Sequence, residues 1–335
     1  MRWGPWQTPP VRTFLTGGTG FIGGRLAARL RDRGDEVAAL VRSPGKAGPL
    51  RDLGCELVRG DLGDPDAIRS GVRGCRAAFH VAADYRVGIP RSKRPAMFEA
   101  NVRGTERVID SAAEAGVERI VYVSTIGAFG NTRGRVVDET YRHPGTGHRT
   151  YYEETKELAH LAAEERVGRG VPVILVMPGG VYGPGDSSDL GKLIDRVRTG
   201  RLPGRMYPEV GFNWVHVDDV VDGILLAHDQ GRIGERYVLG GELGSIGDMI
   251  DAVAEASGRR APRWRWPSPL VKAGIPFGRL IGPMLGLGPN LRELISAADG
   301  VTYWASHEKA VRELGYSPRD LRAGVKETVE ALSAG

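Results

Sequence analysis

The distribution of apolar residues along the chain predicts strands that alternate with helices. Short apolar runs, typical of strands buried on both faces, end in small or polar residues. Stretches with apolar residues at helical spacing lie between them. This alternation indicates βαβ units and a parallel sheet. The predicted strands are residues 13–16, 36–41, 56–61, 77–83 and 119–123, and the predicted helices are 25–30, 65–72 and 97–116.

The first predicted strand ends in a glycine-rich turn that opens a helix. Gly17, Gly20 and Gly23 are spaced three apart. The first allows a tight turn, the second lets backbone N–H groups approach a pyrophosphate, and the third lets the helix pack close to the strand. The helix N-terminus adds partial positive charge. The turn therefore predicts a dinucleotide site on a doubly wound, Rossmann-type α/β fold.

The end of the second strand predicts which dinucleotide binds. A carboxylate that holds the ribose hydroxyls is usual about 20 residues after the glycines, but Val41 stands there and Arg42 follows. A guanidinium binds a 2′-phosphate through charge-assisted hydrogen bonds, each worth roughly 1.5–3 kcal/mol. Arg42, supported by Lys46, therefore favours NADP(H) over NAD(H), although an ordinary surface arginine is the alternative interpretation.

Ligands of parallel sheets lie beyond the carboxyl ends of the strands. Asp61 is therefore placed to accept a hydrogen bond from an adenine amine, and Ala82 and Ala83 are small enough to let a cofactor pass close to the backbone. His80 lies inside the predicted strand, and we interpret it as a core histidine.

A tyrosine and a lysine four residues apart predict an acid–base site. Tyr152 and Lys156 share one face of a predicted helix. A free tyrosine has a pKa of about 10, and a nearby ammonium is expected to lower it. Thr125, or Ser124 beside it, follows the strand at 119–123 and offers a hydroxyl for a carbonyl or alcohol oxygen.

Composition narrows the class of protein. With only two cysteines, the chain can form neither a disulfide framework nor a cysteine-rich metal site, and no metal ligands are predicted. Free thiols are typical of a reducing compartment, so we expect a cytoplasmic location. No run of 18 apolar residues predicts a membrane span. The net charge is +5, but basic residues alternate with acidic ones, so we expect no nucleic-acid partner.

The last third of the chain is less regular. We expect a strand and helix over 214–229, a strand at 237–239, a packing strand at 263–267, an apolar lobe segment over 270–288, and helices at 190–198, 246–256 and 308–331. The predicted organisation is a disordered leader (1–10), a Rossmann core (11–178, completed by about 213–260), a substrate lobe (179–212 and 261–305) and C-terminal helices (306–335).

These motifs resemble those of the extended short-chain dehydrogenase/reductase (NAD-dependent epimerase/dehydratase) family. The resemblance is strongest to its dihydroflavonol-4-reductase-like and hopanoid-associated branch, through residues 80–85 and the Val41-Arg42 strand end. The motifs that carry the family resemblance are residues 16–23, 60–62, 101–105, Tyr152 with Lys156, 181–185, 215–220 and 312–316.

The resemblance implies roles for individual residues. Thr125, Tyr152 and Lys156 would be the catalytic residues. The sequence departs from many relatives at Met177, where they carry a polar residue before the proline, so no polar contact is expected there. The implied cofactor-binding residues are Gly17, Thr19, Gly20, Phe21, Ile22, Gly23, Arg42, Lys46, Asp61, Leu62, Ala82, Ala83, Tyr152, Lys156, Pro178 and Val181.

The hypothesis from sequence is an NADPH-dependent oxidoreductase that reduces the carbonyl of a small organic substrate, with Tyr152 as proton donor. An NAD-dependent nucleotide-sugar epimerase is the alternative. A dehydratase is disfavoured because Ile126-Gly127 replace the Asp-Glu pair expected after Thr125. A cofactor-sensing regulator would be expected to lack Tyr152 or Lys156. Tyr85, Phe129 and Tyr182 are either pocket walls or core residues, and the oligomeric state, a homodimer included, stays open.

Overall fold

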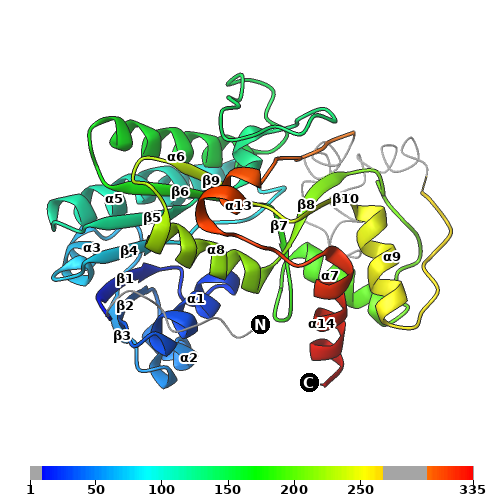
Figure 1. The fold of residues 1–335 in the computed structure, drawn as a ribbon, viewed down its shortest axis with the longest axis horizontal. Coiled ribbons are helices and arrows are strands. Elements are labelled where there is room, and N and C mark those ends of the chain that lie inside the picture. The colour runs from blue at the N-terminus through cyan, green and yellow to red at the C-terminus, as the bar shows by residue number, and fades with distance from the viewer. Residues whose placement is uncertain (1–9, 267–299, 335) are drawn as a thin grey trace.

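The computed structural model describes residues 10–266 and 300–334 and is built around a seven-stranded parallel sheet (Figure 1). The strand order is β3-β2-β1-β4-β5-β6-β9, and every neighbouring pair is parallel. The order reverses at β1, which is the arrangement of a doubly wound Rossmann-type sheet. The predicted fold class is confirmed. The strands are β1 Arg12–Thr16, β2 Glu36–Val41, β3 Glu56–Arg59, β4 Ala77–His80, β5 Arg119–Val123, β6 Val173–Pro178 and β9 Arg236–Leu239.

Successive side chains of each strand point to opposite sides of the sheet, so both faces of the sheet are apolar. Helices cover both faces. On β1, Leu15 joins one apolar cluster and Phe14 joins the other. The first cluster contains residues of α1 (Phe21–Asp32), α2 (Gly48–Asp52), α8 (Val217–Gln230) and α13 (Glu308–Leu314). The second contains residues of α3 (Pro65–Val72), α5 (Gly104–Glu114) and α6 (Tyr151–Gly168).

The helix predicted over 97–116 is a continuous helical stretch that contains a π-helical turn. It runs through α4 (Arg94–Phe98), the π-turn η3 (Glu99–Arg103) and α5. Asn101, in the π-turn, accepts a hydrogen bond from the Asp84 N–H at 2.7 Å and donates one to the Asp84 carbonyl at 3.1 Å. The amide therefore fixes the segment that follows β4. Short 3-10 turns lie at η1 (Pro44–Lys46), η2 (Arg91–Lys93) and η4 (Ile126–Phe129).

A second lobe is built on a three-stranded sheet of order β10-β8-β7. Trp214 of β8 packs there with Met249 of α9 and Val325 of α14. The chain enters this lobe more than once: β8 lies in its sheet, β9 lies in the main sheet, and α9, within the 213–260 stretch that the sequence assigns to the Rossmann core, packs in the apolar cluster of the lobe. The elements are β7 Gly180–Tyr182, β8 Gly211–His216, β10 Glu242–Ser245, α7 Asp189–Arg198, α9 Ile246–Ala256 and α14 Leu321–Ala334.

The helical tail predicted over 308–331 is made of two helices, α13 and α14, because Gly315 adopts the left-handed conformation (φ 66°) and ends α13. One expectation for the C-terminal third is corrected by the structure. The strand predicted at 263–267 is reduced to one isolated bridge between Arg265 and Arg205, and Trp264 is 62% exposed. Residues 1–9 of the predicted leader, and the apolar segment 270–288, lie outside the described residues.

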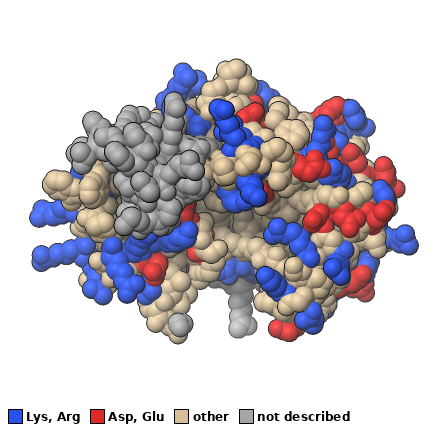
Figure 2. All heavy atoms as spheres, turned by 180° about the vertical axis from the view of Figure 1, so that it is seen from behind, with Lys and Arg blue, Asp and Glu red and all other residues tan. Residues whose placement is uncertain are grey.

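Charges of both signs share the molecular surface. Figure 2 shows acidic and basic side chains side by side over one half of the molecule. Several form pairs, such as Arg166 with Asp110 at 2.7 Å between α6 and α5. Across residues 10–266 and 300–334, the structure holds no helix that is both long enough and apolar enough to cross a membrane.

Candidate functional site

The glycine turn between β1 and α1 has the close packing that its spacing predicts. Gly17 has φ 78°, and a methyl group on it would lie 2.7 Å from the backbone nitrogen of Ala82. The Gly20 N–H donates to the Gly17 carbonyl at 2.9 Å, and a methyl group on Gly23 would overlap that carbonyl. Thr19 and Gly20 are exposed where α1 begins, while Phe21 and Ile22 are half-buried. The turn thus forms a backbone cradle at a helix N-terminus, which fits a pyrophosphate.

A pocket of about 290 Å³ lies at the carboxyl ends of β2 and β3. Val41 of β2 is in register with Arg59 of β3, so Arg42 and Arg59 lie on neighbouring strand ends. Sequence reasoning missed Arg59, although its place two residues before the end of the next predicted strand was a usable signal. Lys46 is exposed in η1 and does not line the pocket. The residues that line the pocket are Arg42, Arg59, Gly60, Asp61 and Asp64.

Strands β3 and β4 end earlier than predicted, so the candidate residues lie in the segments that follow them. The Asp61 carboxylate accepts a hydrogen bond from the Gly63 N–H at 2.8 Å. Leu62 packs on Gly104, where an added methyl group would lie 2.8 Å from the Leu62 Cβ. The Ala82 N–H donates to Thr16 Oγ1 at 3.3 Å; Ala82 is half-buried, and Ala83 is exposed.

His80 is a buried structural residue, as predicted. Its Nδ1 lies 2.7 Å from Thr16 Oγ1, and its Nε2 lies 3.0 Å from Thr105 Oγ1. Burial, together with the positive charge of Lys156, lowers the pKa of His80 to about 3. The imidazole is therefore neutral near pH 7 and links β1 to α5.

The lowered pKa of His80 predicts loss of stability in acid. The unfolded chain takes up a proton near pH 6.5, whereas the folded chain does so near pH 3. The stabilising contribution is complete above about pH 6.5 and falls by about 1.4 kcal/mol per pH unit as the pH drops toward 3. Denaturant unfolding at pH 6.5, 5.5 and 4.5 should show this slope reduced in His80→Asn. Equal slopes in the variant and the wild type would contradict the assignment.

Tyr152 and Lys156 lie at the start of α6, whose first turn is capped by Thr150 accepting from the Glu153 N–H at 3.0 Å. Lys156 Nζ donates to Tyr122 Oη and to the Val123 carbonyl, each at 3.3 Å. The ammonium is thereby held at the carboxyl end of β5. The Tyr152 ring meets the Tyr85 ring edge-on, with centroids 4.8 Å apart, and Tyr85 is 61% exposed.

The structure corrects the expected pKa of Tyr152. Burial raises this pKa above the ordinary value of 10, and the neighbouring Tyr85, Tyr122 and Glu153 raise it further. The Lys156 ammonium does not offset burial, because its hydrogen bonds go to Tyr122 and Val123. Near pH 7 the phenol of Tyr152 is therefore a protonated group and not a phenolate.

The two hydroxyls after β5 have different surroundings. Ser124 is 5% exposed, and its Oγ lies 2.9 Å from His160 Nδ1 of α6. His160 Nε2 in turn lies 3.3 Å from the Glu164 carboxylate. Thr125 is half-buried, and its Oγ1 accepts a hydrogen bond from the Gly127 N–H at 3.1 Å. Ser124 thus belongs to a buried chain of polar contacts, whereas Thr125 keeps a donor hydrogen.

The remaining candidates lie where the main sheet passes into the second lobe. Pro178 is buried at the end of β6, and Val181 is half-buried in β7. Tyr182 is a core residue and not a pocket wall, because it is fully buried and donates to the Leu321 carbonyl at 3.4 Å. Phe129, 4% exposed, is likewise in a core cluster.

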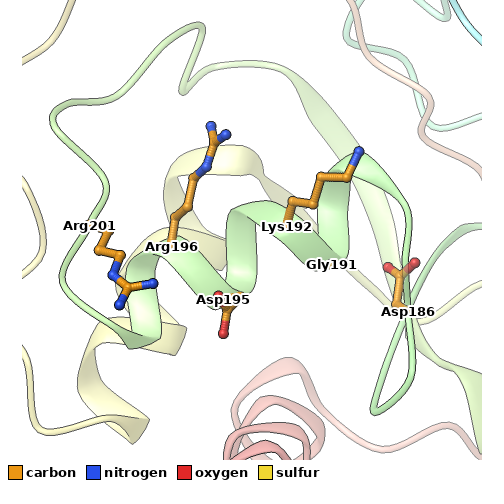
Figure 3. Close-up of a pocket in the computed structure, with 6 residues that line it drawn as sticks. All are labelled: Asp186, Gly191, Lys192, Asp195, Arg196 and Arg201. Carbon is orange, nitrogen blue, oxygen red and sulfur yellow. The ribbon is translucent and has the colours of Figure 1, made fainter. Parts of the chain in front are cut away.

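A second pocket, of about 380 Å³, lies along α7 in the lobe (Figure 3). Two of the charged side chains that line this pocket form ion pairs within α7: Lys192 contacts Asp189 at 2.9 Å, and Asp195 contacts Arg198 at 2.7 Å. No residue predicted from sequence lines it. The lining residues are Asp186, Gly191, Lys192, Asp195, Arg196 and Arg201.

The chain is similar to known proteins over most of its length. Residues 13–240 match the NAD dependent epimerase/dehydratase family. A protein named putative dihydroflavonol 4-reductase, from Synechocystis sp., is 33% identical over 332 residues, covering 94% of this chain and 93% of that protein.

Two further proteins are similar along nearly the whole chain. A 4-hydroxy-2-methyl-3-oxo-4-farnesyl-3,4-dihydroquinoline-1-oxide ketoreductase from Stigmatella aurantiaca is 32% identical and covers 92% of each chain. Among solved structures, a double mutant of the dTDP-glucose 4,6-dehydratase DesIV from Streptomyces venezuelae, with NAD and DAU bound, superposes with a TM-score of 0.76. It is 24% identical, over 96% of this chain and 97% of that chain, and shows a shared fold.

Proposed function

Because this chain belongs to the NAD-dependent epimerase/dehydratase family of extended short-chain dehydrogenases/reductases, we propose that it is an NADPH-dependent reductase of a carbonyl group on a small organic substrate. The family consists of nicotinamide-dependent enzymes, and the similar proteins include ones named as reductases. Our proposal concerns the preference for NADPH and the reduction of a carbonyl group.

The observation that carries the proposal is the anchoring of Lys156 at the carboxyl end of β5, beside Thr125 and one helical turn after Tyr152. Lys156 is anchored on the Val123 carbonyl, Thr125 follows the same strand, and Tyr152 lies one helical turn before Lys156. Ligands of such sheets bind beyond the carboxyl ends of the strands. A phenol, an ammonium and a hydroxyl would thus be available where a substrate carbonyl is reduced.

The cradle of Gly17, Gly20 and Gly23 supports cofactor binding, because there is no room for side chains at Gly17 and Gly23 and the N–H groups of α1 begin there. When bound, the nicotinamide supplies a hydride to the substrate. Lys156 would hold the ribose through its ammonium, and Thr19, Leu62, Pro178 and Val181 would line the groove. Asp61 would flank the adenine.

The raised pKa of Tyr152 agrees with the reducing direction. A phenol that stays protonated near pH 7 can donate its proton to the oxygen of the substrate as the carbonyl becomes an alkoxide. Thr125 would donate a hydrogen bond to the same oxygen and fix its position. Ser124 is a poorer choice for this role because its hydroxyl already contacts His160.

Arg42 and Arg59 support NADPH over NADH. Two guanidinium groups line one pocket at the β2 and β3 ends, where the ribose 2′-phosphate of NADPH would lie. Arg42→Ala and Arg59→Ala should each raise the Kd for NADPH about ten- to hundredfold, since one charge-assisted hydrogen bond contributes about 1.5–3 kcal/mol. The Kd for NADH should stay the same.

Arg51→Ala is the matched control, because Arg51 lies nearby on α2 but does not line the pocket. Fluorescence titration with both cofactors measures the effect. Equal losses for NADPH and NADH in the Arg42 variant would contradict a 2′-phosphate site.

The proposed function itself is tested by titration with NADPH and NADH, followed by a screen of carbonyl substrates with the preferred cofactor. We expect tighter binding of NADPH and its consumption with at least one ketone or aldehyde. NAD that copurifies tightly, with interconversion of nucleotide sugars, would overturn the proposal in favour of an epimerase.

A further inference from the structure

Three side chains that can bind a metal ion converge beside the catalytic helix. His143 and His148 belong to the segment between η4 and α6, and Glu157 belongs to α6. Their ligand atoms all lie within 4.8 Å of one another. Glu157 is 7% exposed, and its Oε2 contacts His143 Nδ1 at 3.0 Å and also His148 Nε2. The two imidazole rings lie 4.5 Å apart, with 30° between their planes.

We propose that His143, His148 and Glu157 bind one divalent transition-metal ion, of which Zn²⁺ is the best match. Two imidazole nitrogens and one carboxylate oxygen are ligands that Zn²⁺ accepts in proteins, with a water completing the tetrahedron. At ligand distances of 2.0–2.2 Å, neighbouring ligands around a tetrahedral ion lie about 3.4 Å apart. The ligand atoms need only small side-chain rotations to reach these positions, because none lies farther than 4.8 Å from another.

The hydrogen bonds around His143 favour a cation in the cluster. The Gly145 N–H donates to His143 Nδ1 at 3.1 Å, which indicates that this nitrogen is unprotonated. With that nitrogen unprotonated, His143 Nδ1 and Glu157 Oε2 present lone pairs to each other at 3.0 Å, an arrangement that a bound cation would stabilise. Gly145 is exposed, so its N–H can turn to water when a metal ion takes the lone pair.

The position of the cluster suggests what the ion would do. The His143 ring lies against Gly130, where an added methyl group would come within 2.6 Å of Nε2. Gly130 ends η4, the turn that Thr125 begins. A bound ion would therefore tie the segment before Tyr152 both to α6 and to the turn after β5, and so stabilise the two segments that carry the proposed reaction. This inference does not depend on the reaction that the protein catalyses.

Calorimetric titration of the full chain, first dialysed against EDTA, tests the proposal directly. We expect one Zn²⁺ per chain, no comparable binding of Mg²⁺, which prefers all-oxygen sites, and a rise in Tm with Zn²⁺. Co²⁺ should give the visible absorption bands of a tetrahedral site. A wild-type protein that binds no Zn²⁺ would overturn the proposal, whatever the variants do.

Substitutions locate the ion. His148→Ala and Glu157→Gln should each weaken Zn²⁺ binding by more than about 100-fold. Loss of a residue that only orients a metal ligand already lowers metal affinity by about 10–100-fold, and these two residues are ligands themselves. His307→Ala is the control and should bind as the wild type, since the His307 ring packs on Tyr316, with ring centroids 6.0 Å apart, and His307 is not one of the three clustered side chains. Circular dichroism verifies that each variant is folded. Unchanged binding in folded Glu157→Gln would refute the site.

Discussion

Replacing Tyr152 with phenylalanine is expected to lower kcat for carbonyl reduction by about 10²–10⁴-fold, the usual contribution of a positioned proton donor. The phenol is the proposed acid, and its raised pKa keeps it protonated at neutral pH. Phenylalanine retains the ring that meets Tyr85 edge-on, so the packing at the start of α6 should persist. NADPH binding should change little, because the cradle at Gly17 and the anchor at Lys156 are untouched.

Tyr151→Phe is the matched control for this substitution. Tyr151 neighbours Tyr152 on α6, but its ring lies under the Arg94 guanidinium at 4.7 Å and its hydroxyl has no proposed role. Steady-state kinetics and NADPH titration of both variants separate chemistry from binding. Normal turnover by Tyr152→Phe, or an equal loss in Tyr151→Phe, would disprove the role of Tyr152.

The sheet and the glycine turn could be predicted because local sequence determines them. The apolar runs at β1, β2 and β5 are long enough to need burial on both faces, and Gly17 has the positive φ that its place in the turn requires. The break between α13 and α14 has a local signal too, since Gly315 and Pro318 stand there.

What the sequence could not give are the contacts between distant segments. Arg59 joins Arg42 only because β3 pairs with β2 in a register that sets Arg59 opposite Val41. The pKa of Tyr152 depends on how deeply α6 is packed and on where Lys156 points, and four-residue spacing reports neither. His143 and Glu157 meet for a similar reason, because the segment before α6 folds back on the helix.

The choice between Ser124 and Thr125 shows the same limit. Both hydroxyls follow β5, and at the level of sequence only the family resemblance favours Thr125 over Ser124. Only the packing of α6 sets His160 against Ser124 and leaves Thr125 bonded to the Gly127 N–H at the start of η4. The assignment of the hydroxyl therefore depends on tertiary structure.

Gly23→Ala is expected to abolish tight NADPH binding and to lower the free energy of unfolding. The added methyl group would overlap the Gly17 carbonyl and lie 2.6 Å from the Gly17 carbonyl carbon, so the backbone of the turn must move. Forced overpacking costs typically about 1–3 kcal/mol, and here the atoms displaced are those that shape the cradle. We therefore expect the Kd for NADPH to rise by more than about 100-fold, which corresponds to roughly 3 kcal/mol.

The neighbouring Gly24 supplies an internal control with the opposite expected sign. A methyl group there would meet only the Gly18 carbonyl at 3.4 Å, which is an ordinary contact, and Gly24 lies in the same helix. Gly24→Ala should raise the free energy of unfolding by about 0.5–1 kcal/mol, because alanine favours the helix and loses less entropy on folding. Denaturant unfolding and NADPH titration of the two variants give the comparison. Similar effects at Gly23 and Gly24 would mean that the close approach of α1 to Gly17 does not shape the cofactor cradle.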